Sequence, residues 1–550
     1  MVASKQIVLP FPISGLNEAF AYADQPRATY SALTGNGRGA STVRCQNVIG
    51  HEPSTGRNRG GSRPGQVKYG PTQVAGSYPV QAITHVVGVQ LTGSIYGEDG
   101  FDLLMEDGTT IDLEDVEIPA DSARQVTIFG ISNGTIAKIS TTGTTAVSGG
   151  TSAFSAGPVS IYSAQSSNNL FFCDGTAYRY YNADSDTIAT WSADSPGELP
   201  VDIAGHAGRL IERWRGRLVV SGLANDPTNW FMSEVDNPFG WDYSPVTLNV
   251  AMAIAGHNSG AGECGDIITG IVPFSDDTLL FGGDHTIWRM TGDPADGGRL
   301  DLVSDIVGMA WGRAWCKSPE GTVYFFGSRG GVYRLDPTGG VPQRLTGTTI
   351  DERLADIHTD DNLVSLVWDD RNLGVLVYIT PKDGSATTHY FWDVRNQAWW
   401  PIVYGNRHQN PLAVHLLDGY DSNDRVVLLG GFDGYVRKID QDAVNDDGTA
   451  IESFVFVGPL SNMMIQEMQA TLGTQSGNVD WSIHTSSTLE AAVDANADRS
   501  GQFFAGRNRS QWPRARIHQG YLRLASVAGW SLDRLVATVE ADTPHRSRIW

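Results

Sequence analysis

The chain has 550 residues, of which 63 are glycine and 15 are tryptophan, and its formal net charge is −22. This length exceeds one ordinary hydrophobic core, so we expect two or three domains, or one large repeat-built domain with appendages. The negative charge argues against a protein that coats DNA, because neutralising phosphates requires clustered lysine and arginine. Many glycines together with many aromatic and β-branched residues favour a mainly β protein.

The first 20 residues make a poor signal peptide, because prolines and an acidic residue interrupt their short apolar run. No stretch approaches the roughly 18 apolar residues of a membrane-spanning helix. We therefore expect no membrane-spanning segment and synthesis in a cytoplasm. The four cysteines lie far apart without a C-x-x-C pair, which predicts neither a zinc site nor a disulfide framework.

Residues 1–75 contain no hairpin pattern and are rich in glycine, proline, serine and arginine. The segment RNRGGSRPG gathers Arg57, Arg59 and Arg63 among glycines, immediately before Pro64. Turn-forming residues and a local excess of cations are typical of an extended segment rather than of a packed unit. We predict that residues 1–75 form an N-terminal extended arm.

Residues 76–451 contain a recurring unit, in which an apolar run is followed by a Gly/Asp/Asn turn and a second, half-polar run. Each unit predicts a β-hairpin. The units begin about 44 to 61 positions apart, at Val126, Leu170, Leu218, Leu279, Val323, Val375 and Val427. This interval is close to the length of one propeller blade. We predict a β-propeller body of about six blades, with a pair of β-sandwiches as the alternative.

Residues 452–550 return to alternating apolar and polar positions, in NVDWSIHTSS and GYLRLASVAG, with one short helix candidate at STLEAAVDANA. Strict alternation is typical of half-buried strands. We predict a small C-terminal β domain here.

Several stretches, taken in order, resemble the tail nozzle (tail tubular protein B-like) proteins of short-tailed bacteriophages. They are HEPSTGRNRGGSRPG in the arm, NWFMSEVDNPFGWDY, LLFGGDHTIWRMTGDP, YFWDVRNQAWWPI and VLLGGFDGYVRKID. The resemblance implies a structural protein of the virion tail, made in the host bacterial cytoplasm, that forms a homohexameric ring at the distal end of the tail. Its partners would be the adaptor or upper tail tube protein and the tail fibre or spike proteins. Genomic DNA would be held back and then conducted through the lumen without specific binding.

The arginine-rich segment allows three interpretations. Arg57, Arg59 and Arg63, with Pro64 fixing the turn, could dock against carboxylates on a neighbouring subunit or on the ring above. A solvated tail without a partner is the plain alternative, and an arm that contacts DNA is the third.

Two further groups of residues allow both a structural and a functional interpretation. Packing within or between blades is the expected role of the large aromatics, and a docking platform for sugars or tail fibres is the alternative; the residues are Trp230, Trp241, Trp399 and Trp400. Four acids at predicted turns either follow the turn preference of aspartate or line a lumen; they are Asp276, Asp277, Asp369 and Asp370.

An enzyme is the hypothesis from another class, because a tail protein could degrade surface polysaccharide. Glycosidases use two carboxylates at a set separation, but 61 acidic residues offer too many pairs to nominate one. No sialidase box, G-x-S-x-G elbow, H-E-x-x-H helix or P-loop occurs in the sequence. We therefore predict no catalytic, metal or cofactor site, with a polysaccharide-degrading or receptor-binding propeller as the alternative function.

Overall fold

The computed structural model describes most of the chain: residues 4–25, 39–89, 124–246, 249–337, 339–347, 349–355, 357–419 and 425–541. These residues are mainly β, as predicted. The few helical turns among them are α1 (Asp351–Ala355), η1 (Arg407–Gln409) and α2 (Leu489–Asp494). None of the described helices is long and apolar enough to cross a membrane.

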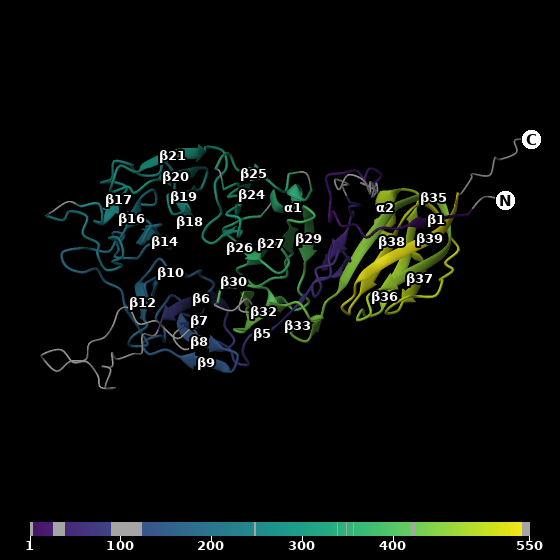
Figure 1. The fold of residues 1–550 in the computed structure, drawn as a ribbon, viewed down its shortest axis with the longest axis horizontal. Coiled ribbons are helices and arrows are strands. Elements are labelled where there is room, and N and C mark those ends of the chain that lie inside the picture. Colours follow the sequence, from purple (N-terminus) through teal and green to yellow (C-terminus); the bar gives the residue numbers. More distant parts are fainter. Residues whose placement is uncertain are drawn as a thin grey trace, which may run out of the picture.

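Seven sheets arranged around one axis form a β-propeller (Figure 1). Six of them each contain four consecutive antiparallel strands. Blade 1 holds β6 (Val80–Val89), β7 (Arg124–Ser132), β8 (Thr135–Ser140) and β9 (Gly143–Ala146); blade 2 holds β10 (Tyr162–Ser166), β11 (Asn169–Cys173), β12 (Tyr178–Asn182) and β13 (Thr187–Thr190); blade 3 holds β14 (Leu210–Trp214), β15 (Arg217–Ser221), β16 (Trp230–Met232) and β17 (Ile254–Ala255).

The next three blades follow the same plan. Blade 4 holds β18 (Ile268–Ser275), β19 (Thr278–Gly283), β20 (Ile287–Thr291) and β21 (Arg299–Ser304); blade 5 holds β22 (Trp315–Lys317), β23 (Val323–Phe326), β24 (Val332–Leu335) and β25 (Gln343–Arg344); blade 6 holds β26 (Asn362–Asp369), β27 (Gly374–Pro381), β28 (His389–Asp393) and β29 (Ala398–Ile402).

The seventh blade is assembled from both ends of the propeller sequence. Its first three strands are β30 (Ala413–Leu417), β31 (Val426–Gly430) and β32 (Val436–Asp440), and its fourth is β5 (Gly65–Lys68), which pairs antiparallel with β32. A short hairpin, β33 (Asn445–Asp446) and β34 (Thr449–Ala450), extends this sheet beyond β5. The innermost strand β30 contacts β6 of blade 1, so the ring of blades is closed.

The predicted count of about six blades is thus corrected to seven. Each of the seven hairpins predicted from the sequence contributes the second and third strands of one blade, as β11 and β12 do in blade 2. The second strands are nearly all buried, which the apolar runs required: every residue of Arg217–Ser221 in β15 is buried, for example. Burial on both faces explains why these strands show no polar alternation.

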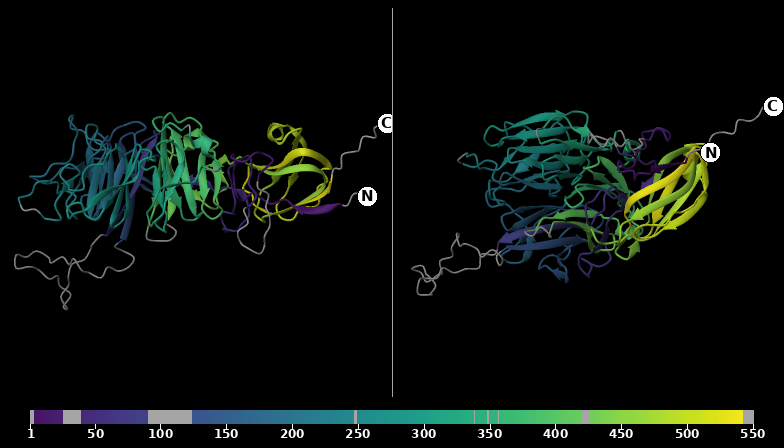
Figure 2. Two further views of the ribbon diagram at one scale, coloured as in Figure 1. Left: turned by 90° about the horizontal axis from the view of Figure 1, so that it is seen from above. Right: turned by 45° about the vertical axis from the view of Figure 1, so that its right-hand side comes forward.

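A seven-stranded sheet lies beside the propeller. Its order is β1-β39-β35-β38-β36-β37, with β2 also paired to β35. The strands are β1 (Lys5–Val8), β2 (Cys45–Gln46), β35 (Ser453–Leu472), β36 (Val479–Ser486), β37 (Ala497–Phe503), β38 (Ala515–Ser526) and β39 (Leu532–Ala541). In Figure 2 the N-terminal segment, in purple, lies between the green blades and this yellow sheet.

The N-terminal segment packs on both neighbours. Its strands β3 (Val48–Ile49) and β4 (Gly61–Ser62) pair with each other, and the backbone N–H of Ser62 donates to the carbonyl of Trp530. One continuous apolar cluster contains Phe11 and Ile49 of this segment, Trp400 of blade 6 and Trp530 of the sheet. The described part of residues 1–75 is therefore a packed connector between the propeller and the sheet.

Candidate functional site

A buried ion pair joins the N-terminal segment to the seventh blade. The guanidinium of Arg63 donates to both carboxylate oxygens of Asp446, at 2.9 and 2.6 Å, and its Nε donates to Asn47 at 3.0 Å. Arg63 is 5% exposed and Asp446 is fully buried. Burial opposes the charge of Arg63, but the adjacent Asp446 carboxylate outweighs it and holds the arginine pKa above its usual value.

A second cation cluster uses the neighbouring acid, Asp447. Arg437 of β32 is almost fully buried and donates to the carboxylates of Asp433 and Asp447. Lys68, the last residue of β5, lies 3.8 Å from Asp447 and 3.9 Å from the ring centre of Tyr435. The ion pair of Lys68 therefore adds to the backbone hydrogen bonds that hold the short closing strand β5.

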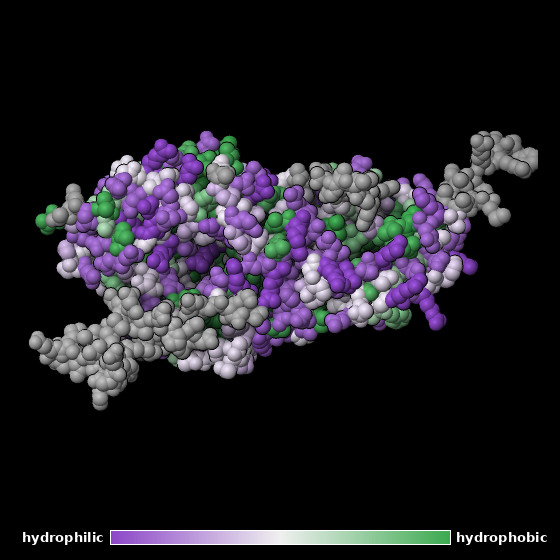
Figure 3. All heavy atoms as spheres, in the orientation of Figure 1, coloured by the Kyte–Doolittle hydropathy of each residue, from purple (hydrophilic) through white to green (hydrophobic). Residues whose placement is uncertain are grey.

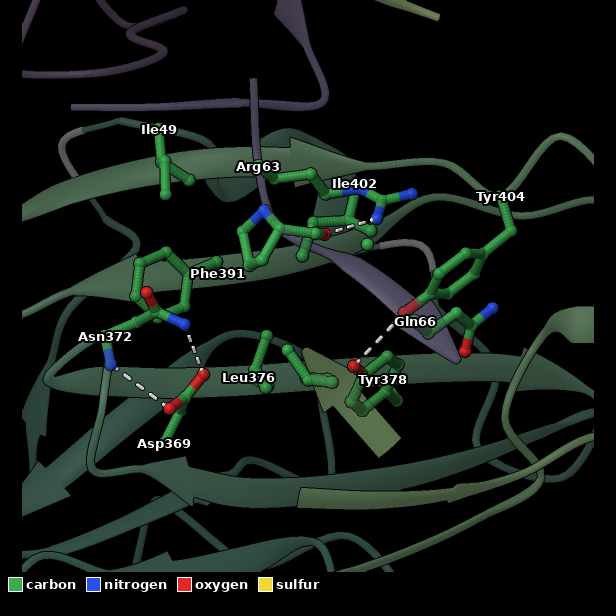
Figure 4. Close-up of a pocket in the computed structure, with 13 residues that line it drawn as sticks. Ile49, Arg63, Gln66, Asp369, Asn372, Leu376, Tyr378, Phe391, Ile402 and Tyr404 are labelled. Carbon is green, nitrogen blue, oxygen red and sulfur yellow. Dashed lines mark hydrogen bonds between the residues drawn. The ribbon is translucent and has the colours of Figure 1, made fainter. Parts of the chain in front are cut away.

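A pocket separates these contacts from blade 6 (Figure 4). The Arg63 ring contact, at 4.9 Å, is with Tyr404, whose hydroxyl lies 3.3 Å from that of Tyr378. The side-chain amide of Gln66 is buried here and forms no hydrogen bond with the residues that the structure describes. Buried polar groups of this kind are uncommon, because each costs free energy when it is desolvated without a partner.

His389 of β28 lies beside this pocket, with its ring centre 5.1 Å from that of Tyr378 and 5.6 Å from that of Tyr404. Its Nδ1 accepts from the backbone N–H of Ile379, its Nε2 lies 3.1 Å from Asn410 Oδ1, and burial lowers its pKa to about 4. An unfolded histidine titrates near 6.5. Its contribution is therefore complete above pH 6.5 and is lost as the pH falls toward 4, because the unfolded state then binds the extra proton.

We expect wild-type stability to fall between pH 6.5 and 4 by about 3 kcal/mol through this group alone. His389→Gln stays neutral throughout this range, so the variant is expected to lose correspondingly less. Urea unfolding midpoints of both proteins at pH 7.5, 5.5 and 4.5 measure the difference. If the urea midpoints of the two proteins fell equally between pH 7.5 and 4.5, His389 would not be the cause of the loss.

The other two arginines of the segment are more exposed. Arg59 pairs with Asp533 of β39 at 3.0 Å and lies 3.6 Å from Glu52, so it also bridges to the seven-stranded sheet. Arg57 is exposed and forms no ion pair with any residue in the described ranges. The structure thus turns Arg63 and Pro64 inward, toward this chain's own blade, and leaves Arg57 as the cation that faces solvent.

The four predicted aromatics lie in the core, where the packing interpretation placed them. They are Trp230, Trp241, Trp399 and Trp400, and each has 0% exposure. The indole N–H groups of Trp230 and Trp241 donate to the carbonyls of Gly262 and Pro238. Because their faces are covered, these side chains offer no platform to an external ligand.

The predicted acids divide into exposed and buried members. Asp276 and Asp277 are exposed at the β18–β19 turn, where Asp277 pairs with Arg215 at 3.1 Å. Asp370 pairs with Arg425 at 2.8 Å. Asp369 is buried and accepts from the backbone N–H groups of the turn that follows β26, so it is turned into the protein and not toward a lumen.

The propeller axis carries polar groups that the sequence analysis did not single out. Glu212 of β14 and Arg313 lie 3.2 Å apart, and burial raises the pKa of Glu212 while Arg313 partly offsets that effect. His85 of β6 and His415 of β30 lie 2.6 Å apart, and burial lowers the pKa of both. Each pair joins residues of two different blades, with Arg313 just before β22, so no local sequence motif marks them.

No family model matches the chain, and no curated protein matches it. Comparison with solved structures gives matches of low similarity. The extracellular domains of two hybrid two-component systems from B. thetaiotaomicron have TM-scores of 0.41 and 0.38, at 11% and 10% identity, over 82% and 70% of this chain and 47% and 46% of theirs. This chain thus spans about half of their length. An exo-β-1,3-galactanase from Phanerochaete chrysosporium has a TM-score of 0.26 at 9% identity, over 64% of this chain and 98% of its own. The seven-bladed architecture accordingly rests on the strand pairing described above.

Proposed function

We propose that the chain is a structural subunit of a virion tail nozzle, a ring that retains the genome and conducts it during ejection. The observation that carries this proposal is the N-terminal connector, which contributes β5 to blade 7 and β1 and β2 to the seven-stranded sheet. A closed propeller leaves only short protected strand edges. Tying it to a second sheet through one core makes a stiff, elongated subunit, which suits a conduit under load.

In this proposal each of the three parts of the chain has its own role. Residues 1–75 are the docking segment, residues 76–451 the propeller body and residues 452–550 a C-terminal β domain. Six copies would close into a ring through a heterologous interface. We assign Arg57 to docking against the adaptor or upper tube ring. The other two arginines of the segment, Arg59 and Arg63, already form ion pairs with acids of their own chain. The net charge of −22 would let DNA pass through the lumen without adhering.

Cryo-electron microscopy of the virions that contain this chain tests the proposal. We expect a sixfold ring at the distal end of a short tail, with the propeller and the seven-stranded sheet of each subunit resolved and Arg57 near the ring above. A chain that instead projects from the tail as a fibre or spike would refute the conduit. The polysaccharide-degrading or receptor-binding function would then be the one to assay.

A further inference from the structure

A wide cavity opens at one end of the propeller axis. Its volume is about 520 Å³. It lies where the inner strands β10, β14 and β26 begin, and the loops before these strands form much of its wall. In Figure 1 these three strands are labelled around the centre of the propeller. A cavity of this size accommodates a ligand of several sugar units.

Arg209 lies at this mouth. Arg209 is exposed, and its guanidinium forms neither a hydrogen bond nor an ion pair with the residues that the structure describes. The guanidinium carbon lies 5.9 Å from the ring centre of Trp311. A Cβ atom at Gly175 would lie 2.7 Å from the Arg209 stem, so the absence of a side chain there lets the stem lie close against the loop. The arginine is therefore positioned by packing, and its donors remain available.

Asp174, one of the two acids of the wall, forms no ion pair with Arg209. Asp174 is buried, and its two carboxylate oxygens accept from the backbone N–H groups of Ser155, Thr176 and Ala177. The loop that contains Ser155 is also held by Gln81, whose side chain donates to the carbonyl of Ser155 at 2.8 Å. The rim is thus fixed before any ligand arrives, which lowers the entropy cost of binding.

The rest of the wall supplies one more cation, Lys382, one exposed acid, Asp360, and neutral hydrogen-bonding groups. The Lys382 ammonium is exposed and donates to the carbonyl of Asp360, which leaves further N–H donors. The Thr359 hydroxyl and the Asn362 amide line the same space. The amide NH₂ of Asn362 donates to the carbonyl of His358, and its oxygen remains an acceptor.

We propose that this mouth binds an acidic saccharide. A planar guanidinium recognises a carboxylate through two parallel hydrogen bonds, so Arg209, assisted by Lys382, would hold the acid group of a sugar. Trp311 presents an aromatic surface to the apolar face of a sugar ring, and Thr359 and Asn362 match its hydroxyls. The site lies within a single subunit and does not depend on the formation of a ring.

Isothermal titration calorimetry of the intact chain at low salt tests the site. The probes are the α-1,4-linked galacturonic acid trimer, a hyaluronan tetrasaccharide and sialyllactose, with the α-1,4-linked galactose trimer and lactose as neutral counterparts. We expect at least one acidic probe to bind at least tenfold more tightly than its neutral counterpart. That affinity should fall as salt rises, because the contact is between charges at an open mouth.

Arg209→Gln and Trp311→Ala are each expected to weaken binding about tenfold or more, the size expected for loss of a charge-assisted contact. Arg499→Gln and Trp512→Ala are the matched controls, because these residues are exposed on the seven-stranded sheet and its loop, and they should bind like the wild type. Unchanged thermal unfolding shows that each variant is folded. The proposal is overturned if no acidic probe binds at millimolar concentration, if the neutral sugars bind equally well, or if both folded mouth variants keep full affinity.

Discussion

Replacing Arg63 by methionine is expected to lower the free energy of unfolding by about 3–5 kcal/mol, the range for removing one partner of a buried ion pair. The cost arises because Asp446, which is fully buried, keeps a charge that no longer has a partner. The change is measured by equilibrium urea unfolding, and hydrogen exchange of the β5 amides reports whether the damage is local to the closing strand.

A matched variant and a double variant make this prediction specific. Arg59→Met removes a partly exposed pair with Asp533 and should cost no more than about 1 kcal/mol. Arg63→Met combined with Asp446→Leu should recover much of the lost stability, because it removes both charges and leaves none unpaired. Equal effects of the Arg59 and Arg63 variants would contradict the assignment of the buried pair as the stronger contact.

Gly65→Ala is the second change for which we expect a large effect, about 3 kcal/mol, at the upper end of the usual cost of overpacking. An added Cβ atom would lie 2.1 Å from the carbonyl oxygen of Asn445, which is far closer than two such atoms can approach. The Cβ atom is fixed to the backbone of β5 and the carbonyl oxygen belongs to the backbone of β33, so neither can rotate away. The strand β5 must therefore move away from β33. The closing strand of blade 7 would then lose pairing.

Hydrogen exchange and urea unfolding measure this effect. We expect less protection of the amides in β5 and β32 and a lower urea midpoint. Gly260→Ala is the control, because nothing lies within 4 Å of the Cβ position there. It should leave stability unchanged or raise it slightly through the unfolded state. A Gly65→Ala protein with wild-type protection in β5 would show that the backbone contact relaxes at little cost.

The glycines and arginines of RNRGGSRPG now have a physical explanation that differs from the one the sequence suggested. Gly61 and Gly65 permit close backbone contacts with Trp530 and Asn445, and Arg63 neutralises a buried carboxylate of its own chain. Docking against carboxylates of another subunit or ring was one of three interpretations that the sequence allowed. None of the three named an acid of the same chain, because nothing in a local window identifies a residue 383 positions away.

The candidate sites were predictable to different degrees. The packing of Trp230 and Trp241 followed from their size and from the apolar stretches around them. The buried state of Asp369 did not, because the same turn preference applies to an exposed aspartate and to one that caps a buried turn. The mouth of the propeller, with Arg209 and Trp311, could not be found from spacing, since its walls come from loops of separate blades.

The mainly β class and the hairpins of all seven blades can be inferred from the amino-acid sequence. Their strand periodicity and turn residues act over about a dozen neighbouring positions, which a linear pattern displays completely. The number of blades, the closure of blade 7 by β5 and the pairing of β1 with β39 became visible only in the folded chain. These features depend on contacts between residues hundreds of positions apart, and many strand pairings are compatible with the same local pattern. Close backbone packing, buried charges and the core together favour one of those pairings.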